Sequence, residues 1–173
     1  MNAYIALLRG VNVTGNGMFP MTELKSMCEK LGFSSVKTYI ASGNVVFNSR
    51  KTEPQVKAIL EKAVGAYLGR PANVLVRTAE EMAAVLVANP FKEMHPSKTM
   101  AFFLDCSPEA NHFDPRAHHI DEQIHPGLRE IYVYYPNGQG QSRLKIPAFK
   151  QATARNMNTV AKLAEMSAAL STK

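Results

Sequence analysis

The chain has 173 residues, of which 46% are apolar and 20% are charged, so it can fold as one domain or as two small packed halves. No stretch approaches the roughly 18 continuous apolar residues of a membrane-spanning helix, and no basic segment followed by an apolar run opens the chain. These features argue against secretion and membrane insertion, and we expect a cytoplasmic protein that has no membrane partner.

The net charge of +6 is concentrated near the C-terminus. Residues 136–173 hold six cationic residues against one acidic residue, whereas the remaining 135 residues hold 14 against 13. A local excess of positive charge is what an anion-binding face requires. A solvated basic tail is the alternative explanation.

The first half of the chain predicts the order strand, helix, strand, strand, helix, strand. Apolar periodicity defines the elements, while Gly32 and Gly69 mark helix ends and Thr52 with Gln55 forms a capping box. This order is that of a ferredoxin-like split βαβ unit. The expected elements are a strand at 4–8, a helix from 20 to 31, strands at 36–41 and 45–47 joined by a turn at 42–44, a helix from 52 to 69, and a strand at 74–76.

The second half predicts fewer regular elements. A capping box at residues 78–81 starts a helix that stops before Asn89, and a buried strand follows at 100–104. Residues 107–114 form a helical or irregular segment, residues 131–135 form a strand, and a last helix begins near Arg155. This order suggests a degraded copy of the first unit, with one subdomain at 1–78 and a second at 79–173.

Three segments of the chain resemble a family of uncharacterised bacterial proteins called domain of unknown function sixteen ninety-seven. They are IALLRGVNVTGN at 5–16, TYIASGNVVF at 38–47 and TARNMNTVAKL at 153–163, and the likeness extends from residue 1 to about residue 170. The resemblance implies an α+β fold of two intertwined ferredoxin-like (βαββαβ-type) subdomains and no established activity. The positions that match the family's motifs are Arg9, Gly10, Asn12, Ser42, Gly43, Asn44, Arg155, Asn156 and Thr159.

The glycine-rich loop at residues 10–17 lies between a predicted strand and a predicted helix, where backbone N–H groups can hold an anion. It is neither a Walker A loop nor a dinucleotide-binding loop, because the Lys-Ser/Thr pair and the G-x-G-x-x-G spacing are missing. Arg9 at a strand end and Arg155 at a helix start are suited to gripping phosphate oxygens, and we expect them to converge. The hypothetical anion site comprises Arg9, Gly10, Asn12, Gly15, Ser42, Asn44, Arg143, Arg155, Asn156 and Thr159.

Each of these residue types also has a structural explanation. Glycines serve any tight turn, and asparagines beside glycines often satisfy the backbone of a turn. Arginines at element ends also cap carbonyl groups or pair with carboxylates inside the fold. The sequence leaves both interpretations open at every position of the hypothetical anion site.

Histidines and cysteines are the remaining candidates for chemistry. His112, His118, His119 and His125 lie within fourteen residues, near Asp121 and Glu122. Their spacing matches no zinc motif, so surface histidines are the simpler explanation, and we expect neither a metal nor another cofactor. Cys28 and Cys106 lack CxxC spacing and are interpreted as reduced structural thiols.

These features favour a binding module for a phosphorylated small molecule or a nucleic acid. An enzyme that acts on a phosphoryl or acyl-phosphate group is the first alternative, because arginine and backbone N–H groups can stabilise developing negative charge. A protein-interaction domain without a small ligand is the second. The sequence identifies no catalytic residue and leaves open whether the protein is an enzyme.

Overall fold

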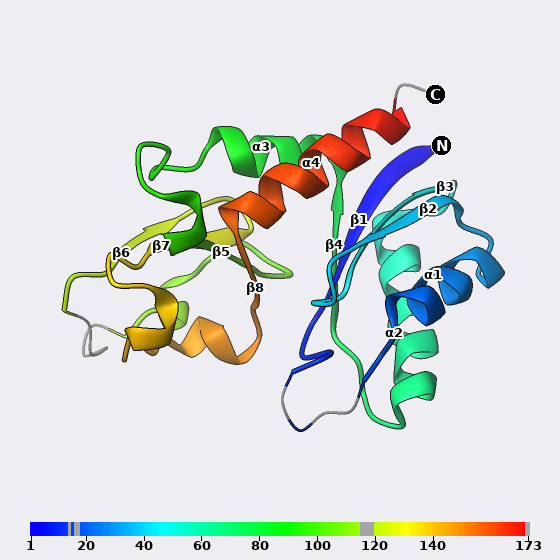
Figure 1. Ribbon diagram of the computed structural model, residues 1–173, viewed down its shortest axis with the longest axis horizontal. Coiled ribbons are helices and arrows are strands. Elements are labelled where there is room, and N and C mark those ends of the chain that lie inside the picture. Colours follow the sequence, from blue (N-terminus) through cyan, green and yellow to red (C-terminus); the bar gives the residue numbers. More distant parts are fainter. Residues whose placement is uncertain (14, 16–17, 115–119, 172–173) are drawn as a thin grey trace. The chain divides into compact units, whose positions relative to one another are not determined.

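The computed structural model describes residues 1–13, 15, 18–114 and 120–171. These residues form four α-helices and two four-stranded antiparallel sheets, which confirms the expected α+β class (Figure 1). The chain divides into two units. Unit 1 comprises Met1–Ala83 with the C-terminal segment from Leu163 on, and unit 2 comprises Ala84–Lys162. The predicted division after residue 78 stays a prediction, because compactness alone does not show which segments fold independently.

Unit 1 contains one sheet with the strand order β2-β3-β1-β4. Every neighbouring pair in this sheet is antiparallel. The order of elements along the chain agrees with the one expected from the sequence. The elements are β1 (Asn2–Leu8), α1 (Met21–Lys30), β2 (Ser34–Tyr39), β3 (Asn44–Ser49), α2 (Glu53–Leu68) and β4 (Val74–Thr78).

Local signals in the sequence set the ends of both helices of unit 1. Pro20 is the N-cap residue of α1, where its fixed φ of −61° fits extended backbone. At the start of α2 the Gln55 side chain accepts a hydrogen bond from the Thr52 N–H at 3.0 Å, which confirms the predicted capping box. Gly69 ends α2 in the left-handed conformation.

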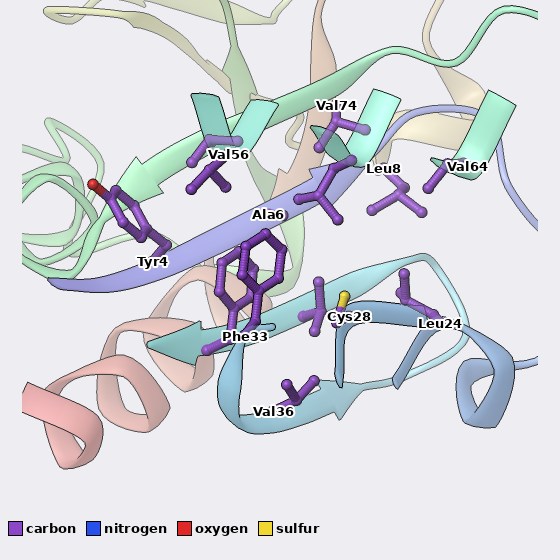
Figure 2. Close-up of a cluster of buried hydrophobic side chains, with 14 of the residues drawn as sticks. Tyr4, Ala6, Leu8, Leu24, Cys28, Phe33, Val36, Val56, Val64 and Val74 are labelled. Atoms are coloured by element: carbon purple, nitrogen blue, oxygen red, sulfur yellow. The ribbon is translucent and has the colours of Figure 1, made fainter. Parts of the chain in front are cut away.

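The core of unit 1 lies between its sheet and the helices α1 and α2 (Figures 1 and 2). Alternate residues of β1 supply one wall, because successive side chains of a strand point to opposite faces. Phe33 and Phe47 stack in this core with ring centroids 4.4 Å apart. The buried core residues that Figure 2 labels are Tyr4, Ala6, Leu8, Leu24, Cys28, Phe33, Val36, Val56, Val64 and Val74.

Unit 2 contains the second sheet, whose strand order is β6-β7-β5-β8 and whose pairs are all antiparallel. Short 3-10 turns, rather than α-helices, lie between its described strands. The helices α3 and α4 both cross from one unit into the other. The elements are α3 (Ala79–Val87), β5 (Thr99–Phe103), β6 (Gln123–Pro126), β7 (Glu130–Tyr134), β8 (Thr153–Asn156) and α4 (Met157–Ser171).

Two strands of unit 2 were not expected from the sequence. β6 is short, polar and ends in Pro126, so it carries no apolar alternation that periodicity can detect. β8 was assigned to the start of the last helix, and this assignment is wrong at Arg155, which lies in a strand opposite Ala101 of β5. β8 depends on backbone pairing with β5, which is distant in sequence, whereas β6 pairs with β7, the next strand along the chain.

The core of unit 2 packs side chains of the sheet against the segment that precedes β8. Leu144, Ile146 and Ala148 of that segment are buried, while Arg143 before them and Lys145 among them are exposed. Phe102 and Phe149 stack with ring centroids 4.2 Å apart. In the part of the chain that the structure describes, no helix combines the length and the apolar character needed to cross a bilayer.

Replacing Gly43 by alanine should destabilise the protein more than replacing Gly32. Both glycines have left-handed backbone, with φ of +87° and +84°, so both substitutions carry the same conformational penalty of about 1–2 kcal/mol. A Cβ at Gly43 would lie 2.5 Å from Val11 Cγ2, whereas a Cβ at Gly32 would meet no atom within 4 Å. We expect about 1–3 kcal/mol of additional loss in the free energy of unfolding at Gly43, measured by urea denaturation. Equal losses at the two sites would contradict this packing.

The two thiols should differ sharply in reactivity. Burial raises the pKa of the Cys28 thiol to about 12, with a smaller contribution from the charge of Glu29, whereas Cys106 is exposed. At pH 8 a thiol reagent should modify Cys106 quickly and Cys28 only after unfolding, and Cys106→Ser should remove the fast reaction. Because an unfolded thiol ionises near pH 8.5, the thiol of Cys28 should also lower stability as the pH rises above about 8.5. Two thiols reacting at equal rates in the folded protein would overturn this expectation.

Candidate functional site

Arg9 is the first residue after β1, and its backbone is fixed by two neighbouring segments of unit 1. The Leu8 N–H donates to the Gly43 carbonyl at 2.8 Å, and the Arg9 N–H donates to the Asn73 carbonyl at 3.0 Å. These bonds continue the pairing of β1 with β3 and with β4 past the end of the strand. The half-buried Arg9 side chain therefore projects from a backbone that the sheet holds in place.

Arg70 approaches the same region from the connection between α2 and β4. It directly follows Gly69, the left-handed residue at the end of α2. Its Nη2 donates to the Gly10 carbonyl at 3.0 Å. Because a guanidinium is a planar fork with several N–H donors, this single bond orients the group toward the loop after β1 without using all of its donors.

Asn73 contributes a buried hydrogen-bond acceptor. Its side-chain Oδ1 is buried, and among the described residues no donor reaches it. Leaving such an acceptor unsatisfied costs about 1–3 kcal/mol. A hydroxyl or N–H group of a ligand would offset that cost, so Asn73 is a candidate contact to a bound molecule.

These three residues share one hollow of about 320 Å³. This volume falls at the lower end of the range of small-molecule sites. Two cationic side chains face this space, and none of its described lining residues is acidic. The arrangement suits a small anion that also carries a donor for Asn73. We call it the Arg9–Arg70 hollow. Its described lining residues are Arg9, Gly10, Arg70, Pro71 and Asn73.

Asn12, a predicted ligand contact, holds the glycine-rich loop closed. Its Nδ2 donates to the Phe19 carbonyl at 2.8 Å and to the Ala41 carbonyl at 2.7 Å, and its Oδ1 accepts from the Phe19 N–H at 2.6 Å. The amide is thus used in hydrogen bonds to the backbone of Phe19, before α1, and of Ala41, after β2. Gly15 lines a second hollow of unit 1, and residues 14, 16 and 17 of the predicted loop lie outside the described residues.

Ser42 and Asn44 shape the turn between β2 and β3. The Asn44 Nδ2 donates to the Tyr39 carbonyl at 2.9 Å and to the Ser42 hydroxyl at 2.8 Å. Asn44 is fully buried. Asn44 therefore stabilises the turn. The Gly43 carbonyl of the same turn accepts the hydrogen bond from the Leu8 N–H.

Arg155 and Asn156 belong to unit 2. The Arg155 Nη1 donates to the Ala154 carbonyl at 2.8 Å, and burial lowers the pKa of the guanidinium to about 10. The Asn156 Oδ1 accepts from the Thr159 N–H at 3.0 Å, so Asn156 caps the start of α4. Thr159 is buried, and Arg143 is exposed.

Of the predicted anion-site residues, the structure places Arg9 and Gly10 in one hollow. Asn12 and Gly15 line the second hollow, and Ser42 and Asn44 form a turn. Arg155 lies in the other unit, so its convergence with Arg9 stays a prediction.

Sequence reasoning missed Arg70, Asn73 and Arg77. Arg70 follows a helix-ending glycine and Asn73 precedes a strand, which are ordinary positions for surface polar residues. Arg77 is only 1% exposed, and its Nη1 donates to the Val76 carbonyl at 2.8 Å, as Arg155 does to Ala154. A single charged residue in an apolar strand was the available signal, but its burial could not be inferred without the fold.

The histidine segment offers no metal centre in the described part of the chain, where no group of three or more His, Cys, Asp or Glu residues is arranged to hold an ion. The His112 Nδ1 accepts from the Glu109 N–H at 2.7 Å. The Ser142 hydroxyl donates to Glu122 and lowers the pKa of that carboxyl group to about 2. His118 and His119 lie outside the described residues.

Comparison with known proteins identifies the family of this chain. The family model described as Protein of unknown function (DUF1697) matches residues 1–132. The chain belongs to this family. This confirms the resemblance to the family, and two of its three sequence segments lie inside the matched range. The family description assigns no activity. Residues 9, 10, 70 and 73 of the Arg9–Arg70 hollow all lie inside the matched range.

A solved structure shows the same fold. Conserved bacterial protein SP0830 from Streptococcus pneumoniae aligns with 95% of this chain and 98% of its own, with a TM-score of 0.75 and 22% sequence identity. At this identity the likeness concerns the fold alone. No curated protein matches the chain.

Changing Asn12 to aspartate should destabilise the loop after β1. The substitution keeps the shape but replaces a group that donates two hydrogen bonds by an oxygen that faces two carbonyl oxygens. We expect a loss of about 1–3 kcal/mol in the free energy of unfolding. The control is Asn158→Asp, an exposed site in the first turn of α4, where a carboxylate is neutral or slightly stabilising. Similar urea denaturation curves for the two variants would refute the bridging role of Asn12.

Proposed function

We propose that this protein binds a small phosphorylated ligand in the Arg9–Arg70 hollow. The observation that carries the proposal is a space of about 320 Å³ lined by two arginines and by Asn73, whose buried side-chain oxygen has no donor among the described residues. Guanidinium forks match phosphate oxygens bidentately, and the Asn73 oxygen can accept a hydrogen bond from a ligand hydroxyl. A phosphate monoester with a neighbouring hydroxyl offers both kinds of group.

Binding is a better fit than catalysis for the described part of the hollow. Its lining residues include no histidine, carboxylate, cysteine or serine that would serve as a general base or a nucleophile. Two arginines can stabilise developing charge on a phosphoryl group, but they cannot accept a proton at neutral pH. Turnover of a phosphoryl or acyl-phosphate substrate is therefore the weaker candidate.

Nucleic-acid binding is supported by a different observation. Between residues 143 and 150 burial alternates, so that Leu144 and Ile146 enter the core of unit 2 while Arg143 and Lys145 point to the surface. Lys150 is exposed as well. A row of outward cations suits a phosphate backbone, whereas the small volume of the Arg9–Arg70 hollow suits a small molecule.

For the fold, we propose that each unit is ferredoxin-like and that unit 2 is a copy that lost its two sheet-covering helices. The two sheets have equivalent strand orders, and their registers correspond. Arg77 pairs with Ile5 as Arg155 pairs with Ala101. The Leu8 N–H donates to the Gly43 carbonyl as the Leu104 N–H donates to the Arg129 carbonyl.

The free thiols of Cys28 and Cys106 support a reducing, cytoplasmic location.

The test is calorimetric titration with inorganic phosphate, glycerol 3-phosphate and glycerol. We expect glycerol 3-phosphate to bind more tightly than phosphate, and glycerol not to bind. Arg9→Ala and Arg70→Ala should each weaken binding by about tenfold to a hundredfold, because each removes a charge-assisted hydrogen bond worth about 1.5–3 kcal/mol.

The matched control for this titration is Arg143→Ala, which removes the same charge from an exposed position in unit 2. Its affinity for glycerol 3-phosphate should equal that of the unaltered protein, while its affinity for a mixed single-stranded oligonucleotide should fall if the basic row binds nucleic acid. No detectable binding at low salt, or equal losses in all three variants, would refute the proposed site.

A further inference from the structure

Unit 1 has a second, larger hollow, whose lining begins two residues after Gly10 of the Arg9–Arg70 hollow. Its volume is about 700 Å³, which is ample for a small ligand. It lies against the loop after β1, the start of α1 and the turn after β2. The described lining residues are Asn12, Val13, Gly15, Met18, Phe19, Pro20, Met21 and Ala41.

The surface of this second hollow is apolar. Met18 is 82% exposed and Val13 is 51% exposed, an unusual position for two large apolar side chains at the mouth of one hollow. Phe19 is fully buried and stacks on Tyr67 with ring centroids 4.5 Å apart, which makes it a rigid part of the wall. Methionine side chains are flexible and polarisable, so Met18 and Met21 can adapt to a hydrocarbon group.

Polar recognition is weak in the second hollow. Among the described lining residues Asn12 has the only side chain with hydrogen-bonding groups, and its amide already makes three bonds to the backbone of Phe19 and Ala41. A nucleobase or sugar placed there would lose hydrogen bonds to water without regaining them from side chains. A hydrocarbon loses nothing and gains about 0.8 kcal/mol for each buried methylene.

A single residue, Val11, separates the linings of the two hollows along the chain. Gly10 lines the charged hollow and Asn12 lines the apolar one. Two residues span at most about 7 Å, so one molecule can contact both hollows. Val11 between them is only 4% exposed. Its backbone therefore forms a fixed divider between a cationic site and an apolar site.

We propose that the ligand of this protein is an amphiphilic phosphate monoester, a single hydrocarbon chain that ends in a phosphate group. The phosphate lies between Arg9 and Arg70, and the chain lies against Val13, Met18 and Met21. The inference rests on the proposed function, since it takes the phosphate site as given. It concerns a free, monomeric ligand rather than the surface of a lipid bilayer.

The experiment is calorimetric titration with inorganic phosphate and with butyl, hexyl and octyl phosphate, each below its aggregation concentration. Affinity should rise about threefold to fourfold per methylene until the hollow is filled. The double variant Val13→Thr with Met18→Gln changes two exposed side chains, so folding should be unaffected. In this variant the affinity for alkyl phosphates should rise much less with chain length, while the affinity for inorganic phosphate should be unchanged.

The matched control makes the same two changes in unit 2, at exposed Val87 and Met94, and should keep the full dependence on chain length. If the alkyl phosphates bind with an affinity that does not depend on chain length, the amphiphilic ligand is ruled out and the proposed function stays intact. Tighter binding of a nucleoside monophosphate than of octyl phosphate, or binding to phosphatidic acid vesicles without binding to octyl phosphate, would also overturn it. If no phosphate compound binds, the proposed function itself fails.

Discussion

The candidate site depends on two backbone hydrogen bonds at the carboxyl end of β1. The Leu8 N–H bonds to the turn after β2, and the Arg9 N–H bonds to the segment before β4. A central strand has a neighbour on each side, so its end can gather loops from both. Because of these bonds, Arg9 and Asn73 face one hollow, and Arg70 closes it through the Gly10 carbonyl. The packing of Gly43 against Val11 keeps the turn close enough for the first bond to form.

Unit 2 repeats this framework with different chemistry. The Leu104 N–H bonds to Arg129 at the end of β5, as Leu8 bonds to Gly43 at the end of β1. The next residue is Asp105 in unit 2, whereas it is Arg9 in unit 1. The Arg129 side chain donates to the Asp105 carbonyl, much as Arg70 donates to that of Gly10. The same backbone position thus carries a cation in unit 1 and an acid in unit 2, so the end of β1 suits a small anion better than the end of β5 does.

Much of unit 1 was predictable from the sequence because its signals are local. The capping box at Thr52, the glycine stop at residue 69 and the continuous apolar run of β1 each act within one turn or one strand. Unit 2 was harder to predict. β8 has the sequence Thr-Ala-Arg-Asn, which carries no strand period, and it becomes a strand because β5 offers it a partner. The helix after it begins where Asn156 caps the Thr159 N–H, so the predicted helix start was displaced by the strand.

The sequence by itself determined the family and the α+β class, and it predicted Arg9 and Gly10 as candidate site residues. These properties are written in contiguous motifs and in local periodicity. Tertiary structure alone decided that Arg70 and Asn73 line one hollow with Arg9, that the Asn12 amide bonds to Phe19 and Ala41, and that Arg77 is buried. The physical reason is that a hollow is formed by loops which strand pairing brings together, and the pairing of residues some sixty positions apart leaves no trace in either segment alone.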